Sequence, residues 1–222
     1  MRYLKFVKEF IKHPKQVGAV AESSGFLARK MAEQIGESAN VVEFGPGTGS
    51  VTMEILRKLP ANGKLTCLEI NPKFCEDLKK INDHRLHVVN DDVRNFSRNI
   101  ENYDCVLSSL PLAIFEKTQR DKIIAISGRA KKYVQFQYTP FLKPKLKRYF
   151  EDVEIKFVPL NLPPAFVYVS TNQKQNRKVS PSGTFAALQQ GHKAQDVRTQ
   201  GKKSFPVKVA MQLFMVFVNL WR

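Results

Sequence analysis

The chain has 222 residues, 43% of them hydrophobic, which is enough for one globular domain with a buried core of its own. Lys and Arg total 36 against 20 Asp and Glu, a formal net charge of +16, so the expected partners are polyanions: nucleic acid or an anionic membrane surface. The three cysteines form no CxxC pair, which argues against a disulfide framework or a zinc site. We therefore expect a protein of the reducing cytoplasm that binds no metal. No stretch reaches the roughly 18 uncharged apolar residues of a spanning helix. We therefore expect a protein that is soluble or lies on a membrane.

The first 13 residues have an amphipathic pattern. Apolar side chains recur there at helical spacing, and basic side chains take most of the other positions, with only Glu9 opposing them. The apolar set is Tyr3, Leu4, Phe6, Val7, Phe10 and Ile11, and the basic set is Arg2, Lys5, Lys8 and Lys12. The pattern is typical of an amino-terminal amphipathic helix in a membrane interface. A helix packed on its own domain, or laid on RNA phosphates, is the alternative.

From residue 24 to residue 169, short β-rich runs alternate with helical patterns, as in an open α/β sheet. We predict strands at 40–44, 65–70, 86–89, 103–108, 132–137, 152–157 and 166–169, and helices at 2–12, 24–34, 50–58, 73–80, 114–127 and 142–148. The last two strands must be antiparallel, because parallel neighbours need a crossover of a dozen or more residues and only residues 158–165 connect these two. The prediction is a Rossmann-like α/β fold with seven strands and an antiparallel last strand, the arrangement of class I methyltransferases.

The strongest chemical signal is VVEFGPGTGS at 41–50, an apolar strand that runs through alternating glycines into a helix. Such glycines let the backbone turn sharply and approach a ligand at the carboxyl end of a strand. A dinucleotide fingerprint would need glycine at position 50, where Ser50 stands, and a phosphate-binding P-loop would need a Lys-Ser/Thr pair that is missing. The spacing instead indicates an S-adenosylmethionine site that contains Glu43, Gly45, Gly47 and Gly49.

Two acidic positions follow the next strands in an order that suits a nucleoside. Glu69 ends the predicted strand 65–70, where a carboxylate can accept both hydroxyls of a ribose. Asp92 follows the strand 86–89 and can accept a hydrogen bond from the adenine amine, while Val93 can pack on the ring. Either acid alone would fit a solvated strand end or a helix cap. The ordered set predicts S-adenosylmethionine as the cofactor.

The fourth predicted strand ends in SSLPL at 108–112, where a methyl acceptor would meet the cofactor. Over residues 3–169 the chain resembles the bacterial phospholipid N-methyltransferases, relatives of the ribosomal RNA adenine dimethyltransferases, through VVEFGPGTGSVT, LTCLEINPKFC, SSLPL, VQFQYTPFLKP and NLPPAFVYV. The resemblance implies methylation of an aminophospholipid such as phosphatidylethanolamine, at the inner face of the membrane. In the adenine enzymes an Asn or Asp grips the amine and an aromatic ring stacks on the base. Ser109 and Leu112 stand at those positions here, which favours a lipid headgroup.

Ser109, Leu110 and Pro111 are therefore predicted to form the acceptor site, and Ser109 also to contact the cofactor. Tyr138, near the end of the fifth strand, is predicted to hold the methylated ammonium by cation–π attraction, with Phe26 as a further candidate. Ordinary core packing is the alternative for both rings. Two other functions remain open: a ribosomal RNA adenine N6-dimethyltransferase, with nucleic acid as its partner, and a cofactor-binding module without catalysis.

Residues 1–172 are predicted to form the methyltransferase domain and residues 173–222 a basic, largely disordered extension. The segment 171–204 is rich in Gln, Lys, Ser and Gly with few apolar residues. The final run PVKVAMQLFMVFVNLW is apolar but is interrupted by Lys208, Gln212 and Asn219, so it is unsuited to span a bilayer alone.

Overall fold

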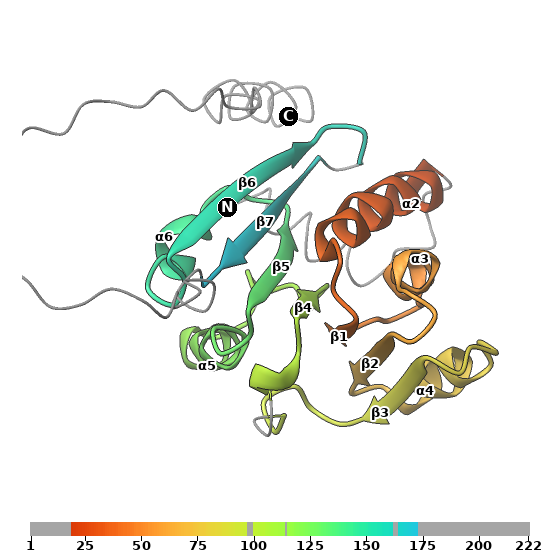
Figure 1. Ribbon diagram of the computed structural model, residues 1–222. Helices are drawn as coiled ribbons and strands as arrows, with labels where there is room; N and C mark the ends of the chain where they lie inside the picture. The colour runs from red at the N-terminus through yellow and green to blue at the C-terminus, as the bar shows by residue number, and fades with distance from the viewer. Residues whose placement is uncertain (1–18, 97–99, 114, 162–163, 173–222) are drawn as a thin grey trace, which may run out of the picture.

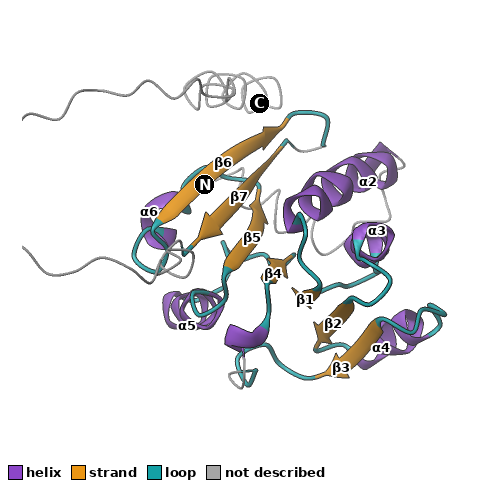
Figure 2. Cartoon of the chain, viewed as in Figure 1, coloured by secondary structure: helices purple, strands orange, loops and turns teal. Residues whose placement is uncertain are grey.

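The computed structural model describes residues 19–96, 100–113, 115–161 and 164–172 (Figure 1). Its strands form one sheet, and helices cover both faces of that sheet (Figure 2). The strands are β1 (Asn40–Phe44), β2 (Lys64–Glu69), β3 (Leu86–Asn90), β4 (Cys105–Ser108), β5 (Lys132–Gln137), β6 (Asp152–Val158) and β7 (Ala165–Thr171).

The helices are α2 (Ala19–Ala32), α3 (Ser50–Lys58), α4 (Pro72–Lys79), α5 (Lys117–Ser127) and α6 (Lys143–Leu146), with 3-10 turns at Glu33–Ile35 and Ile100–Asn102. Helices α2 and α3 pack on one face of the sheet, and α5 and α6 pack on the other. None of the helices described is long and apolar enough to cross a bilayer.

The sheet has the order β3-β2-β1-β4-β5-β7-β6. Strands β1 to β5 are parallel, and β7 is antiparallel to both β5 and β6. The seven-stranded sheet with an antiparallel last strand is thereby confirmed. The strand order reverses between β1 and β4, and in open α/β sheets such a switch point places a binding crevice outside the carboxyl ends of the strands.

The central strands are buried on both faces because helices cover both sides of the sheet. Val42 and Phe44 of β1 pack toward α5 and α6, whereas Val41 packs toward α2 and α3. All three side chains are fully buried. This two-sided burial explains why residues 41–44 of β1 are apolar except for Glu43, rather than alternating between apolar and polar.

The predicted bounds agree with the structure for β1, α3 and β5 and differ elsewhere by a few residues. Helix α5 begins at Lys117 rather than at residue 114, because the backbone of its cap, Glu116, is extended with ψ 154°. Helix α6 is shorter than the predicted 142–148, and the chain beyond it continues in single turns such as Tyr149 N to Leu146 O, 2.9 Å. The helix predicted at 2–12 and the extension 173–222 lie outside the described residues.

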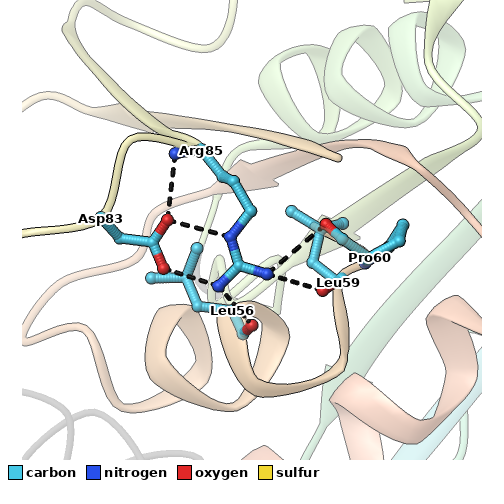
Figure 3. A network of polar contacts seen from close by, with 5 residues as sticks. All are labelled: Leu56, Leu59, Pro60, Asp83 and Arg85. Atoms are coloured by element: carbon cyan, nitrogen blue, oxygen red, sulfur yellow. Dashed lines mark hydrogen bonds and ion pairs between the residues drawn. The ribbon is translucent and has the colours of Figure 1, made fainter. Parts of the chain in front are cut away.

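Arg85, just before β3, ties this edge strand to the carboxyl end of α3 (Figure 3). Its guanidinium donates to the carbonyl oxygens of Leu59 at 2.6 Å and Leu56 at 2.9 Å, which lack helical partners. Asp83 holds the guanidinium from the other side at 2.6 Å, and this hydrogen bond is the main reason that the pKa of Asp83 falls to about 2. A groove of about 440 Å³ lies beside the network. Since Arg85 stands at the amino end of β3, the network lies at the opposite end of the parallel strands from the predicted cofactor site.

Candidate active site

The loop at residues 45–49 joins β1 to α3 at the carboxyl edge of the sheet. Gly45 and Gly47 have φ angles of 67° and 56°, in the left-handed region that favours glycine. A Cβ at Gly45 would lie 2.6 Å from Leu110 Cδ2, whereas a Cβ at Gly47 would meet nothing within 4 Å. The predicted glycine Gly49 packs closely too, since a Cβ there would lie 2.9 Å from Leu78 Cδ2. The loop is therefore packed against protein at both ends and open at Gly47, as a ligand-binding loop requires.

Glu69 lies next to this opening, at the end of β2. Its Oε2 accepts the backbone N–H of Gly47 at 3.1 Å, and its Oε1 accepts the N–H of Asn71 at 2.8 Å. The residue is only 7% exposed, so these donors hold the carboxylate in one orientation. Each oxygen keeps a further lone pair, and the carboxylate can therefore still accept two hydroxyl groups. The structure thus brings Glu69 and the glycine loop together as predicted.

Asp92 follows β3 at the same edge of the sheet. Its carboxylate pairs with Arg94, whose Nε donates to both oxygens at 2.9 Å and whose Nη2 makes a shorter contact. These hydrogen bonds are the main cause of a pKa for Asp92 below its usual value, so the group is an ionised acceptor at neutral pH. Val93 is 8% exposed and packs in the core beside Phe44 and Leu68. The guanidinium partner of Asp92 was not anticipated from the sequence.

Among the predicted cofactor residues, Glu43 has the most deeply buried side chain. Its side chain is fully buried, and Oε2 accepts hydrogen bonds from Thr52 Oγ1 at 2.7 Å and from Cys67 Sγ at 3.4 Å. Oε1 has no hydrogen-bond partner among the described residues. Burial raises the pKa of Glu43 to about 7. Alternation along β1 turns this side chain inward toward α3, so a cofactor contact at Glu43 stays a prediction. No group of three His, Cys, Asp or Glu side chains in the described ranges could hold a metal ion.

The end of β4 meets the glycine loop directly. Ser109 N donates to Phe44 O at 3.0 Å, and Leu110 packs on Gly45. Ser109 Oγ is buried and has no hydrogen-bond partner in the described part of the chain. A buried hydroxyl left without a partner costs about 1–3 kcal/mol, so this position suits a polar atom of a ligand. Pro111 is half-buried, and Leu112 is fully buried in the core.

Tyr138 and Phe26, the predicted ammonium wall, both pack against the core cluster beneath α2 and α3. Tyr138 makes an edge contact with Phe136 at 5.5 Å, and burial raises its pKa to about 12. Lys30 Nζ already lies 5.6 Å from the centre of the Phe26 ring. The observed contacts match the packing alternative, and an ammonium contact at Tyr138 remains a prediction.

Two polar residues of the site were missed in the sequence. Gln135 and Gln137 both donate from their amide nitrogens to Leu110 O, at 3.0 and 3.2 Å. Both side chains are buried although they lie in an otherwise apolar strand. Two glutamines separated by one residue in a strand share a face of the sheet, and that spacing was the available signal.

The fold and this site define a class I S-adenosylmethionine-dependent methyltransferase. The family model described as a methyltransferase domain matches residues 41–132, which run from β1 to the start of β5. The chain is also 32% identical over 191 residues to the ornithine lipid N-methyltransferase of Singulisphaera acidiphila, an alignment that covers 78% of this chain and 98% of that protein. The chain belongs to this family of bacterial lipid N-methyltransferases, which confirms the resemblance found in the sequence.

Solved structures agree on the fold. Magnesium protoporphyrin IX methyltransferase from Synechocystis PCC 6803, with bound S-adenosylmethionine, superposes with a TM-score of 0.58 at 10% identity, over 71% of this chain and 86% of that chain. Precorrin-6y C5,15-methyltransferase from Geobacter metallireducens GS-15 superposes with a TM-score of 0.53 at 18% identity, over 66% and 88% of the two chains. At these identities the likeness concerns the architecture alone.

S-adenosylmethionine is the cofactor of the enzyme, as its family requires. When bound, it supplies an electrophilic methyl group on a sulfonium. The residues present fit such a ligand, because Gly47 leaves open backbone, Glu69 keeps lone pairs for hydroxyls and Ser109 Oγ lacks a partner. These residues, with Asp92 at the end of the next strand, would hold it.

Proposed function

We propose that this N-methyltransferase modifies the amine of a phospholipid headgroup such as phosphatidylethanolamine. An amine reacts through its neutral form, so the protein has to position it, exclude water and let the ammonium proton leave beforehand. None of these tasks needs a nucleophilic side chain. An uncharged polar atom at the end of β4, such as Ser109 Oγ, suits these tasks.

The observation that carries the proposal is the character of the β4 end. Ser109 offers an unpartnered hydroxyl there, and Leu112, at the position that needs an aromatic ring for base stacking, is fully buried in the core. An adenine acceptor has to be flipped out and stacked, and losing its aromatic platform forfeits about 1–3 kcal/mol. A lipid headgroup needs no such platform. These side chains favour a lipid amine over adenine.

A peripheral position on the inner face of the cytoplasmic membrane is part of the same proposal. The basic, amphipathic pattern at residues 1–13 supports it, as does the formal net charge of +16. The described surface adds Phe141, which is 66% exposed and is followed by Lys143, Lys145 and Lys147 on and next to α6. An exposed ring among lysines suits a headgroup region.

An ornithine lipid is the second candidate acceptor, because the curated relative is named for that substrate. Such a lipid also presents a primary amine at the membrane surface. The β4 end offers neutral polar atoms that would accept hydrogen bonds from either amine, so the geometry does not favour one lipid.

The test is to incubate the protein with methyl-labelled S-adenosylmethionine and one of three acceptors: phosphatidylethanolamine vesicles, ornithine lipid vesicles or undermethylated ribosomal RNA. Label in phosphatidylethanolamine is the expected result. Label in the ornithine lipid alone would mean that this lipid, and not phosphatidylethanolamine, is the acceptor. Label in RNA alone would mean that the protein is an adenine methyltransferase. Label in none of them, with cofactor binding intact, would indicate a binding module.

A further inference from the structure

The backbone carbonyl of Leu110, at the centre of the acceptor site, is already saturated with hydrogen bonds. It accepts the N–H of Leu112 at 2.9 Å and the amide nitrogens of Gln135 at 3.0 Å and Gln137 at 3.2 Å. A carbonyl oxygen has two lone pairs. No capacity is left at this oxygen for an N–H of a substrate, although it directly follows Ser109 in the chain.

Gln135 and Gln137 differ in which atoms of their side-chain amides are already hydrogen-bonded. Gln135 uses its whole amide, because Oε1 accepts the hydroxyl of Tyr133 at 2.6 Å and Nε2 donates to Leu110 O and to Phe136 O. Gln137 uses only Nε2, and no described residue donates to its Oε1. The orientation of the Gln137 amide follows from chemistry: a carbonyl only accepts, so Nε2 must turn toward Leu110 and Oε1 must turn away.

We propose that Gln137 Oε1 binds an N–H of the acceptor amine, next to the hydroxyl of Ser109. The inference rests on the proposed function in one respect, that the acceptor is an amine. An amine that directs its lone pair at a methyl group needs acceptors for its N–H bonds. Ser109 Oγ is buried without a partner in the described part of the chain, and no described residue donates to Gln137 Oε1, so both oxygens are available to an N–H.

The neutrality of both groups matters for the reaction. A carboxylate at this position would stabilise the ammonium form and raise its pKa, which would reduce the reactive neutral amine at a given pH. An amide oxygen accepts the N–H without that cost. Gln137 is 5% exposed and lies at the end of β5, so its environment amplifies any charge placed there.

The first test compares Gln137→Met with the matched control Gln135→Met in the full chain, on whichever aminolipid the wild-type protein methylates. Each variant removes one hydrogen bond to Leu110 O. Gln135→Met also removes the contacts to the Tyr133 hydroxyl and to Phe136 O, so it is the more disruptive change, and only Gln137→Met removes the free oxygen. We expect Gln137→Met to lower kcat/KM for the aminolipid about tenfold below that of Gln135→Met, with the cofactor Kd unchanged in both. Equal losses of kcat/KM in the two variants would mean that Gln137 only positions Leu110 and does not bind the amine.

The second test is the pH dependence of Gln137→Glu. The carboxylate should raise the pKa of the bound ammonium, so the rising limb of kcat should move to higher pH by about one unit or more. A purely structural role would lower the rate without moving the limb, and that result would overturn the proposal. Failure of the wild-type protein to methylate any aminolipid would instead contradict the proposed function, which keeps the two failures distinct.

Discussion

Gly47 N lies 3.1 Å from Glu69 Oε2, a hydrogen bond that links the loop after β1 to the end of β2. The same carboxylate accepts the Asn71 N–H, so backbone donors determine its orientation. Glu69 therefore has two roles at once: it holds the open part of the glycine loop in place, and it presents its remaining lone pairs at the mouth of the site.

Glu69→Ala should weaken S-adenosylmethionine binding by about 1.5–3 kcal/mol, since charge-assisted contacts to hydroxyls and the bond to Gly47 are lost together. Isothermal calorimetry measures the change. Glu76, an exposed carboxylate on α4, provides the matched control, and Glu76→Ala should leave the affinity unchanged. Equal affinities for wild-type protein and Glu69→Ala would remove the ribose role from this residue.

The buried Glu43 should make the free energy of unfolding of the protein depend on pH. Burial raises its pKa in the folded state to about 7, above the value of 4.5 expected for the unfolded chain. Below pH 4.5 both states hold the proton. As the pH rises from 4.5 to 7 the unfolded state loses it first, so the free energy of unfolding falls over this window and is then level.

Glu43→Gln should remove this component, because the amide does not titrate. The wild-type protein should lose about 3 kcal/mol relative to the variant between pH 4.5 and pH 7.5. Urea denaturation of both proteins at a series of pH values measures the difference. Parallel stability curves would show that the folded protein ionises Glu43 at no cost.

The hydrogen bonds of Arg85, at the opposite end of the parallel strands from the active site, should stabilise the folded protein. Arg85→Met should cost about 2 kcal/mol, since the carbonyls of Leu56 and Leu59 and the carboxylate of Asp83 lose their donor together. Arg85→Lys keeps the charge but not the forked donors, so its free energy of unfolding should lie between those of the wild type and Arg85→Met. Chemical denaturation ranks the three proteins. A lysine variant as stable as wild type would mean that charge alone is responsible.

The sheet was predictable because its signals are local. Strand β1 is an apolar run that stops at Gly45, and the short connection between β6 and β7 allowed only an antiparallel pair. Ends without a strong stop signal were less certain: α2 begins at Ala19, several residues before its predicted start, and α5 begins only after the extended Glu116. Those ends depend on tertiary packing, which propensity does not record.

The proximity of Gly47 and Glu69 was predictable, because the spacing of their motifs places both at the carboxyl ends of neighbouring strands. Partners that arise only in three dimensions were not. Arg94 shields Asp92, and Gln137 reaches Leu110 from a strand 27 positions later in the chain. The full burial of Glu43 was not foreseen for a related reason, because a motif position does not reveal toward which face of β1 a side chain points.

The amino-terminal segment should carry membrane attachment. Reversing three charges, Lys5→Glu, Lys8→Glu and Lys12→Glu, should abolish sedimentation with anionic vesicles at physiological salt and leave cofactor affinity intact. The matched control reverses Lys202, Lys203 and Lys208 in the carboxyl-terminal extension. Loss of binding in the control alone would transfer the membrane contact to that extension.

A lipid amine as the acceptor is tested by mass spectrometry of the lipids and the ribosomal RNA from cells that express the protein. Cells with Glu69→Ala serve as the background. We expect methylated aminolipids that depend on the wild-type protein, with phosphatidylethanolamine as the proposed headgroup, and no increase in dimethyladenosine. Dimethyladenosine without any methylated aminolipid would contradict this expectation.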